Sequence, residues 1–355
     1  MLSKSNFSRR HIDELHRRYP KVTESVFEMS MYAFGLLELL ADSRLDFIFK
    51  GGTSLMLLLK EPKRVSTDID ILVPPHTDMA PVIASIQHEY PLLDLSKDKL
   101  QSQNGRSVGH WVFECPHLYG TSAHVCLDVV YGDNPYPRVE ERPITNSFLL
   151  IDGLPRMVKV PSIESLLGDK LTAFAPHTIG VHPEMTTFGT PFDKRLQIIK
   201  HLYDINALLS EAKDFSAIRS SYFAIAEQEA VLHNLSAYSP KDFLGDTFRS
   251  ALSIATLGFG DEHAEYREVF APGITKLVDH VFAFDWTVSK AQECAVNVML
   301  LSACLLQGED IFHLKIQHRP GYHQKPYSYL NRTLLIPGEF DKAIQAIGIF
   351  DPKAC

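Results

Sequence analysis

The hydrophobic pattern near the N-terminus predicts a helix, a strand, a sharp turn and a second helix. Between residues 22 and 41, apolar side chains recur every three to four positions, the period of an amphipathic helix. Residues 46–50 (DFIFK) form a compact apolar run that is typical of a short buried strand. Gly51 and Gly52 then punctuate the pattern, and we expect a helix over residues 53–60.

The pattern then continues as mixed α/β structure. Residues 68–73 (DIDILV) alternate with a period of two and end at a pair of prolines, which indicates a strand. We expect a helix at 79–89 and further strands at 110–115 (HWVFEC) and 123–131 (AHVCLDVVY). These elements predict a small mixed sheet flanked by helices, in a first domain that covers residues 1–155.

Beyond residue 155 the pattern becomes mainly helical. Ser162 is a candidate N-cap for a helix at 163–175, and residues 193–210 have apolar positions at helical spacing. The connection 176–192 is rich in Gly, Pro and Thr and long enough to be functional or mobile. The sequence therefore predicts an α+β protein whose second domain, residues 156–355, is mainly helical.

Composition places the chain among ordinary globular proteins. Its 355 residues are enough for two domains, and its hydrophobic and charged fractions of 45% and 22% are those of a folded protein. No apolar run approaches the roughly 20 residues that a bilayer span needs, and the N-terminus lacks an apolar signal core. A cytoplasmic location without a membrane partner is the expectation. The five scattered cysteines argue against a disulfide framework and a zinc site.

The net charge of −8 gives no overall attraction to nucleic acid, but two local stretches are basic. The first is the arginine-rich N-terminus between residues 9 and 21. The second, residues 313–332, contains no acid and interleaves three tyrosines with Lys and Arg. Cations neutralise phosphates and rings stack on bases, so this segment is a candidate grip for RNA. The alternative is a polar loop packed on the helical domain.

Two aspartates and a glycine turn suggest a site for a nucleotide and a metal ion. Asp68 and Asp70 lie on one face of the predicted strand, where their carboxylates repel each other unless a cation separates them. Mg²⁺ is bound in this way, by one or two carboxylates together with waters and substrate phosphates. The backbone amides at Gly51 and Gly52 would favour the phosphates. Taken singly, each feature is also compatible with an ordinary turn or strand end.

Several motifs in a fixed order resemble the AbiEii/AbiGii-type nucleotidyltransferase toxins, a branch of the DNA polymerase β-like nucleotidyltransferase superfamily. The matching segments are FKGGTSL, RVSTDIDI, VCLDVVY, LLGDKLTAFA and KHLYDINALL. Together they extend from about residue 25 to 210. One departure is the separation of Gly52 from Asp68 by fifteen residues, which is longer than in much of the superfamily. The resemblance implies a polymerase β-like domain followed by the helical domain.

The resemblance also implies a role for each matched residue. Asp68, Asp70 and Asp128 would hold Mg²⁺, or Mn²⁺ in its place, and Asp128 would either complete a second metal site or accept the proton of the incoming hydroxyl. Lys170 would place a positive charge on the phosphates, with a solvated helical lysine as the alternative. Asp204 would face the site, or instead form a salt bridge with Lys200 or Arg195 (residues of the predicted helix 193–210).

Thr53 and Ser54 follow the glycine turn. Either their hydroxyls contact the phosphates of the nucleotide, together with Gly51, Gly52 and Lys170, or they perform ordinary helix capping. The bound nucleotide would be an NTP that serves as the substrate.

The function implied by the resemblance is that of a nucleotidyltransferase toxin in a bacterial toxin–antitoxin or phage-defence system. It would transfer a nucleotide from NTP to an acceptor, with the acceptor end of tRNA as the leading candidate and an antitoxin protein as a partner. Three alternatives remain at this point. One is transfer to a protein or small-molecule hydroxyl, the second is a nucleotide- or RNA-binding toxin subunit without turnover, and the third is a D-x-D glycosyltransferase. The last leaves the glycine turn and Lys170 unexplained.

Overall fold

The computed structural model describes residues 1–103, 106–120, 122–187, 190–259, 263–282, 286–321 and 327–351. The chain divides into two compact units. The first unit consists of Met1–Ser162 together with Asp279–Asp285, and the second of Ile163–Val278 together with Trp286–Cys355. No sequence pattern predicted that the short segment Asp279–Asp285 belongs to the first unit.

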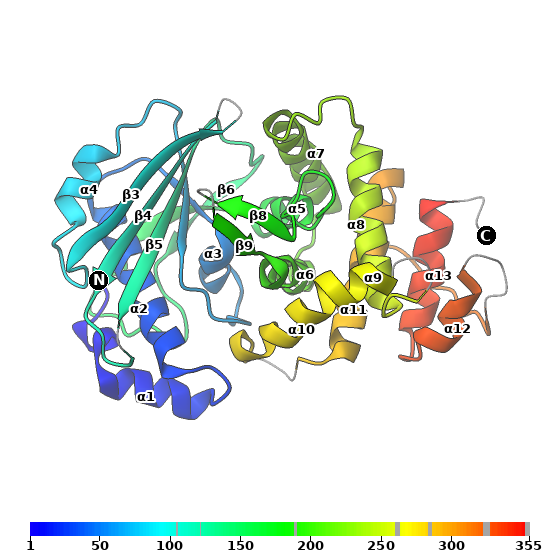
Figure 1. Cartoon of the computed structure of the whole chain (residues 1–355), viewed down its shortest axis with the longest axis horizontal. Coiled ribbons are helices and arrows are strands. Elements are labelled where there is room, and N and C mark those ends of the chain that lie inside the picture. Colours follow the sequence, from blue (N-terminus) through cyan, green and yellow to red (C-terminus); the bar gives the residue numbers. More distant parts are fainter. Residues whose placement is uncertain are drawn as a thin grey trace. The chain divides into compact units, whose positions relative to one another are not determined.

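The first unit is built on a seven-stranded mixed sheet with the order β3-β4-β5-β2-β1-β7-β6 (Figure 1). Its strands are β1 (Ile48–Lys50), β2 (Ile69–Val73), β3 (Asp94–Gln103), β4 (Arg106–Cys115), β5 (Ala123–Tyr131), β6 (Val139–Pro143) and β7 (Met157–Pro161). β1 and β2 are antiparallel, whereas β2 pairs with β5, and β1 with β7, in parallel. The remaining pairs are antiparallel.

One face of this sheet carries the core of the unit. The helical segments are η1 (Lys4–Phe7), α1 (Arg9–Arg18), α2 (Glu24–Asp42), α3 (Gly51–Leu58) and α4 (Ala80–Ile86). The apolar positions predicted for α2 are largely confirmed, since Phe27, Phe34 and Leu37 are almost fully buried, and α2 packs against β5 and β2. Phe49 and Ile71 contribute to this core from the sheet. Residues that alternate with them project from the other face.

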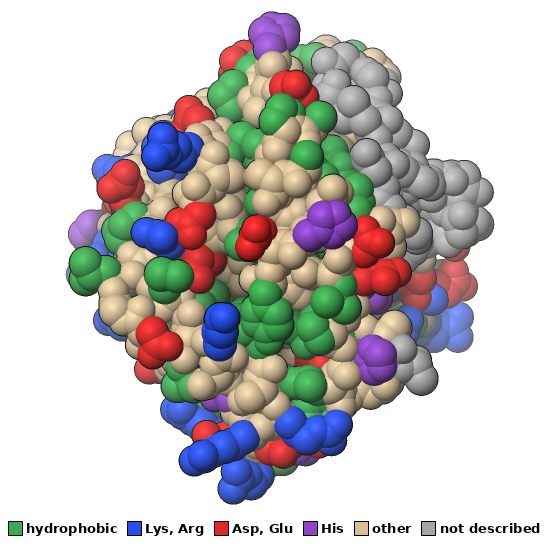
Figure 2. Space-filling view, turned by 90° about the vertical axis from the view of Figure 1, so that its left-hand side faces the viewer, with side chains coloured by type: hydrophobic (Ala, Val, Ile, Leu, Met, Phe, Trp, Pro, Cys, Tyr) green, Lys and Arg blue, Asp and Glu red, His purple; other side chains and the backbone are tan. Residues whose placement is uncertain are grey.

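The arginines of the N-terminal stretch lie on α1 and are exposed. In Figure 2 blue side chains gather at the bottom of the first unit, at the height where Figure 1 shows α1. The guanidinium of Arg9 donates to the carbonyl of Leu118 and stacks over the ring of Tyr119, with its central carbon 4.6 Å from the ring centre. One of the predicted basic side chains therefore also fixes the connection between β4 and β5.

The second unit is mainly helical, as predicted. Its helical segments are α5 (Ile163–Ala173), α6 (Arg195–Leu209), α7 (Phe215–Leu232), α8 (Pro240–Ala255), α9 (His263–Glu265), η2 (Tyr266–Phe270), α10 (Ala271–Leu277), η3 (Val278–His280, whose last two residues belong to the first unit), α11 (Val288–Gln307), η4 (Tyr327–Tyr329), α12 (Leu330–Thr333) and α13 (Glu339–Phe350). α5 packs against α6 and α7, while α11 packs against α8 and α13. A mixed sheet followed by a helical region confirms the predicted fold class. In the described part of the chain, no helix has the length and hydropathy needed to cross a bilayer.

Two segments of uncertain role have defined structure over much of their length. The connection 176–192 contains β8 (Glu184–Thr187) and most of β9 (Thr190–Asp193), which pair in antiparallel fashion. In the basic segment 313–332, residues 322–326 lie outside the described residues. Upstream of them, the backbone amide of Arg319 donates to Asp341 on α13, at 2.9 Å, which is the behaviour of a loop packed on the helical domain. The contact of the basic segment 313–332 with RNA stays a prediction.

The structure describes four of the five cysteines. Cys115, Cys126, Cys294 and Cys304 form no disulfide in the described part of the chain, while Cys355 lies outside the described residues. Burial raises the pKa of Cys115, Cys294 and Cys304 to about 12, so these thiols stay protonated at neutral pH.

His177 is expected to make the stability of the second unit depend on pH. The pKa of His177 is raised above its usual value of 6.5, because its imidazole shares a hydrogen bond with the carboxylate of Glu265. A raised folded-state pKa contributes stability that is complete below the unfolded value and is lost as the pH rises through the folded value. We expect His177→Gln to lower the melting temperature by about 1–3 °C at pH 5.5, a small shift because the pair is half exposed. Thermal unfolding at pH 9 should show no difference, and a constant difference at all pH values would contradict this account.

Candidate active site

Four polar side chains form a row across the open face of the sheet. Asp70 in β2 lies opposite Lys50 in β1 and opposite Asp128 in β5, and Asp128 lies opposite His110 in β4. Directly opposed residues on neighbouring strands carry their side chains on the same face. The register therefore places two carboxylates side by side, with a lysine on one flank and a histidine on the other. All four residues are partly exposed, in contrast to the buried core face.

The glycine turn faces one of these carboxylates. Gly51 has a φ of +76°, a conformation that glycine adopts without strain. A Cβ at Gly51 would lie 1.9 Å from Oδ2 of Asp70, so the carboxylate occupies the space that a side chain would take. Gly51 thus serves both the turn and the close approach of Asp70. The structure brings together the glycine turn and the aspartate that the sequence singled out.

The second glycine faces a basic and a hydroxyl side chain. A Cβ at Gly52 would lie 2.6 Å from Nη2 of Arg64 and 2.8 Å from Oγ of Ser66. Arg64 is only 7% exposed, and its backbone forms a bridge with Val281 in the segment that returns to the first unit. Arg64 belongs to the segment RVSTDIDI that resembles the family, but the sequence predicted no role for it. Its burial beside the turn adds a positive charge to the place where phosphates are predicted to bind.

Asp68 occupies a more open position just before β2. Its side chain is exposed, and its backbone carbonyl accepts a hydrogen bond of 2.5 Å from the hydroxyl of Thr53. The hydroxyl of Ser54 donates to the carbonyl of Gly51 at 2.9 Å. Thr53 and Ser54 are fully buried, so their hydroxyl hydrogens fix the turn and its link to Asp68. Their predicted contacts with phosphate stay predictions.

His110 holds the carboxylate of Asp128. Its Nδ1 lies 2.6 Å from Oδ1 of Asp128, and both side chains remain partly accessible. A histidine in this position restricts the rotation of the carboxylate and can share its proton. Sequence reasoning assigned no role to His110, although it begins the predicted strand at 110–115. What places His110 in the site is the pairing register between β4 and β5, and a single sequence does not reveal this register.

The second unit pairs the two remaining residues of the predicted site. Nζ of Lys170 on α5 lies 3.3 Å from Oδ2 of Asp204 on α6, with side-chain exposures of 6% and 1%. This burial excludes the alternative of a solvated Lys170. Arg195, a candidate partner of Asp204, has its guanidinium 2.8 Å from Asp193. The contribution of Lys170 and Asp204 to the phosphate site stays a prediction.

The carboxylates of the row suit a hard divalent cation that is completed by its substrate. Among the described residues, no three His, Cys, Asp or Glu side chains are grouped as a ready metal cage. A Mg²⁺ ion bound together with a nucleotide needs only one or two carboxylates, because phosphate oxygens and waters supply the other ligands. Asp70 and Asp128 are adjacent, and Asp70 faces the glycine turn where phosphate would lie. These residues therefore fit the predicted ion.

Gly51→Ala is expected to damage the site through the position of Asp70. The added Cβ would overlap the carboxylate of Asp70, and alanine is strained at a φ of +76°. We expect a loss of stability of about 1–2 kcal/mol from the backbone alone and a larger proportional loss of nucleotidyl transfer. Gly153→Ala is the matched control, because Gly153 also has a positive φ, +79°, but nothing within 4 Å of its Cβ position. Equal losses of transfer in both variants, measured with labelled NTP, would contradict the steric role of Asp70.

The glycine turn, the paired carboxylates and the mixed sheet are the features of a nucleotidyltransferase. The family model described as "Nucleotidyl transferase AbiEii toxin, Type IV TA system" matches residues 36–290. The chain therefore belongs to the AbiEii family of nucleotidyltransferase toxins. The match extends over most of both units, which confirms the family resemblance drawn from the motifs.

A search of curated proteins finds no match. Among solved structures, the chain is similar to an antigenic nucleotidyltransferase-like protein from Paracoccidioides brasiliensis. The two share 18% sequence identity, and the alignment covers 59% of this chain and 91% of that one, with a TM-score of 0.34.

Proposed function

We propose that this toxin transfers a nucleotide from an NTP to a hydroxyl group of RNA, with the acceptor end of tRNA as the target, in a Mg²⁺-dependent reaction in the cytoplasm. The observation that carries the proposal is the adjacency of Asp70 and Asp128 on paired strands, with Asp70 against the glycine turn. A carboxylate pair that faces a bare backbone turn supplies a metal position and a phosphate position within one small site.

The reaction is a displacement at the α-phosphorus of the NTP. The oxygen of the acceptor hydroxyl forms a bond with the α-phosphorus, while the bond between this phosphorus and the oxygen bridging to the β-phosphate breaks. Pyrophosphate leaves with the bond electrons, and the hydroxyl proton passes to a basic group of the site. Asp128, oriented by His110 at 2.6 Å, is the candidate acceptor of that proton.

The residues around the turn have separate tasks in this scheme. The amides of Gly51 and Gly52, with the cationic Arg64 beside them, bind the phosphates of the leaving group. Asp70 and Asp128, and Asp68 at the entrance of β2, would hold Mg²⁺ or Mn²⁺. When bound, such an ion neutralises the charge that develops on the attacking and leaving oxygens. Lys170 and Asp204 are proposed to complete the phosphate site.

Two basic stretches of the chain favour RNA as the acceptor. The basic segment 313–332 and the arginines of α1 offer cations for an RNA backbone, and the counterions released from RNA favour such binding. Membership in a type IV toxin–antitoxin family supports an antitoxin protein as the partner that restrains the activity.

Transfer from labelled nucleotides tests the proposal directly. Purified protein is incubated with each labelled NTP, Mg²⁺ and total RNA, and the products are separated by size. We expect label at the size of tRNA with one added nucleotide, and none when EDTA replaces Mg²⁺. Label on protein would instead support a protein hydroxyl as the acceptor, and label from a UDP-sugar alone would support a glycosyltransferase. If no NTP gave any labelled product, the result would support a toxin subunit that binds nucleotide or RNA without turnover.

A further inference from the structure

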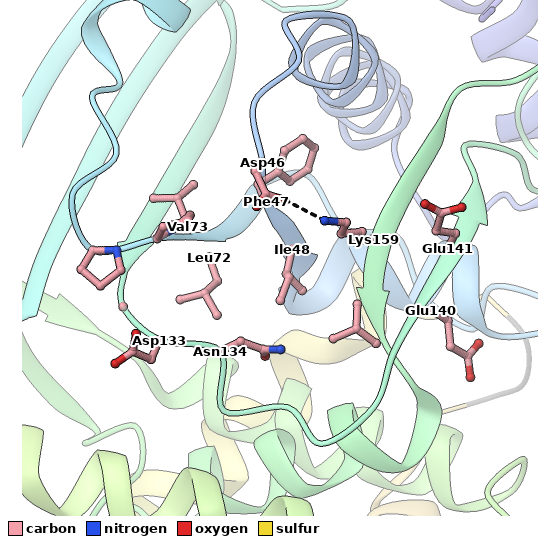
Figure 3. Close-up of a pocket in the computed structure, with 14 residues that line it drawn as sticks. Asp46, Phe47, Ile48, Leu72, Val73, Asp133, Asn134, Glu140, Glu141 and Lys159 are labelled. Atoms are coloured by element: carbon pink, nitrogen blue, oxygen red, sulfur yellow. Dashed lines mark hydrogen bonds and ion pairs between the residues drawn. The ribbon is translucent and has the colours of Figure 1, made fainter.

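A pocket of about 510 Å³ lies in the first unit, and its lining is separate from the four residues of the carboxylate row. Its apolar floor includes Ile48 of β1 and Leu72 of β2, and its rim includes Asp133 and Asn134, which follow β5 (Figure 3). Lys159 of β7 and Glu141 of β6 line the side beyond β1. The residues that line this pocket have no role in the reaction proposed above.

Strand register places the pocket on the same face of the sheet as the carboxylates. Ile48 and Leu72 oppose each other, just as Lys50 and Asp70 do two residues further along the same strands. Because side chains alternate, residues two apart share a face and lie about 7 Å from one another. Leu72, in the floor of the pocket, therefore lies about 7 Å from Asp70 along the same face of β2.

The chemistry determines which substrate belongs on this side. In an in-line displacement, the attacking and leaving oxygens lie on opposite sides of the phosphorus. In the proposed reaction the leaving pyrophosphate binds at the glycine turn, which comes directly after Lys50 at the end of β1. The pocket begins at Ile48, on the other side of Lys50 along the same strand. The pocket consequently lies on the side from which the acceptor hydroxyl approaches.

The charges of the pocket select the part of the acceptor that can enter. Asp46 and Lys159 form an ion pair of 2.8 Å, and Glu140 pairs with Arg142 at 2.6 Å. Asp133, by contrast, has no hydrogen bond or ion pair with any described residue. An ionised carboxylate only accepts hydrogen bonds, so it favours amino groups and repels phosphate.

The neighbouring Asn134 adds a donor. Its Oδ1 accepts the backbone N–H of Tyr136 at 2.9 Å, which leaves its Nδ2 for a ligand. In Figure 3 the carboxylate of Asp133 and the amide of Asn134 point in opposite directions, so the carboxylate of Asp133 alone is the acceptor for the amino group of a base. The apolar side chains of the floor suit a flat ring.

We propose that this pocket binds the base of the terminal nucleoside of the RNA acceptor, and that Asp133 accepts a hydrogen bond from its exocyclic amino group. The proposal rests on the proposed function and specifies its acceptor. A terminal nucleoside carries phosphate on one side only, so its base enters with less repulsion than that of an internal nucleotide. The pocket thus favours RNA ends whose base carries an exocyclic amino group, such as cytosine, over ends in uracil.

Two short RNAs that differ only in a 3′-terminal cytidine or uridine test the proposal. Cytosine presents an amino group where uracil presents a carbonyl oxygen. We expect the wild-type protein, with Mg²⁺ and labelled NTP, to use the cytidine-ended RNA with a kcat/KM about 10- to 100-fold higher. Asn in place of Asp133 can donate to the carbonyl, so Asp133→Asn should reduce this ratio to about threefold or less.

Glu141→Gln is the matched control for charge. It removes the same negative charge from the other side of the pocket, because β2, β1 and β7 lie between β5 and β6. We expect this variant to keep the cytidine preference of the wild type. Equal use of the two RNAs by the wild type, an unchanged ratio in Asp133→Asn, or equal changes in both variants would overturn the base pocket while leaving nucleotidyl transfer intact. Absence of label on either RNA would overturn the RNA acceptor itself.

Discussion

Asp70→Asn is expected to reduce nucleotidyl transfer by about a thousandfold while leaving the fold intact, the magnitude typical for the loss of a charge-stabilising catalytic element. Asparagine has nearly the same volume, so it can keep its place against Gly51 and between Lys50 and Asp128. What it loses is the negative charge that would hold the metal ion. The rate of label transfer from NTP to RNA measures the loss, and we expect growth inhibition in cells to disappear with it.

The control for Asp70 is Asp152→Asn, an exposed carboxylate in the connection between β6 and β7 of the same unit. The transfer rate and the melting temperature of Asp152→Asn should match those of the wild type.

We also expect Asp68→Ala to lose transfer, since Asp68 is the other member of the D-x-D pair. Retention of toxicity in Asp70→Asn would instead indicate a toxin that acts by binding, without turnover.

Lys170→Met is expected to destabilise the second unit by about 3–5 kcal/mol, because it removes the ammonium group that lies 3.3 Å from the buried carboxylate of Asp204. Both side chains are nearly inaccessible to water, so solvent cannot replace the lost partner. A urea titration of the full chain, followed by circular dichroism, should show a lower midpoint for this variant. A midpoint equal to that of the wild type would show that the pair contributes little to the fold.

The double variant Lys170→Met/Asp204→Leu separates stability from activity. Replacing both partners of a buried ion pair by apolar side chains is often neutral for stability, so we expect the urea midpoint to recover most of its loss. If Lys170 also binds phosphate, nucleotidyl transfer must remain absent although the fold is restored. Recovery of transfer in the double variant would assign the pair a purely structural role.

The elements with a strong periodic pattern could be predicted from the sequence. The strand expected at 123–131 is β5, and the helix expected at 22–41 is α2 with a shift of one or two residues. β3 was missed because its sequence, DLSKDKLQSQ, has few apolar side chains, as suits a strand at the edge of the sheet. The helix after the glycine turn begins at Gly51, two residues earlier than expected.

The sequence by itself determined which side chains share a strand face or follow a turn, because these relations depend only on local periodicity. It therefore identified the D-x-D pair and the glycine turn as candidates, whereas Lys170 and Asp204 became candidates through the family resemblance of their motifs. Only the tertiary structure decided that Asp128 lies beside Asp70, that His110 holds Asp128, and that Lys170 contacts Asp204. These contacts join residues far apart in the chain, so they depend on strand register and helix packing, which the burial of the whole core selects.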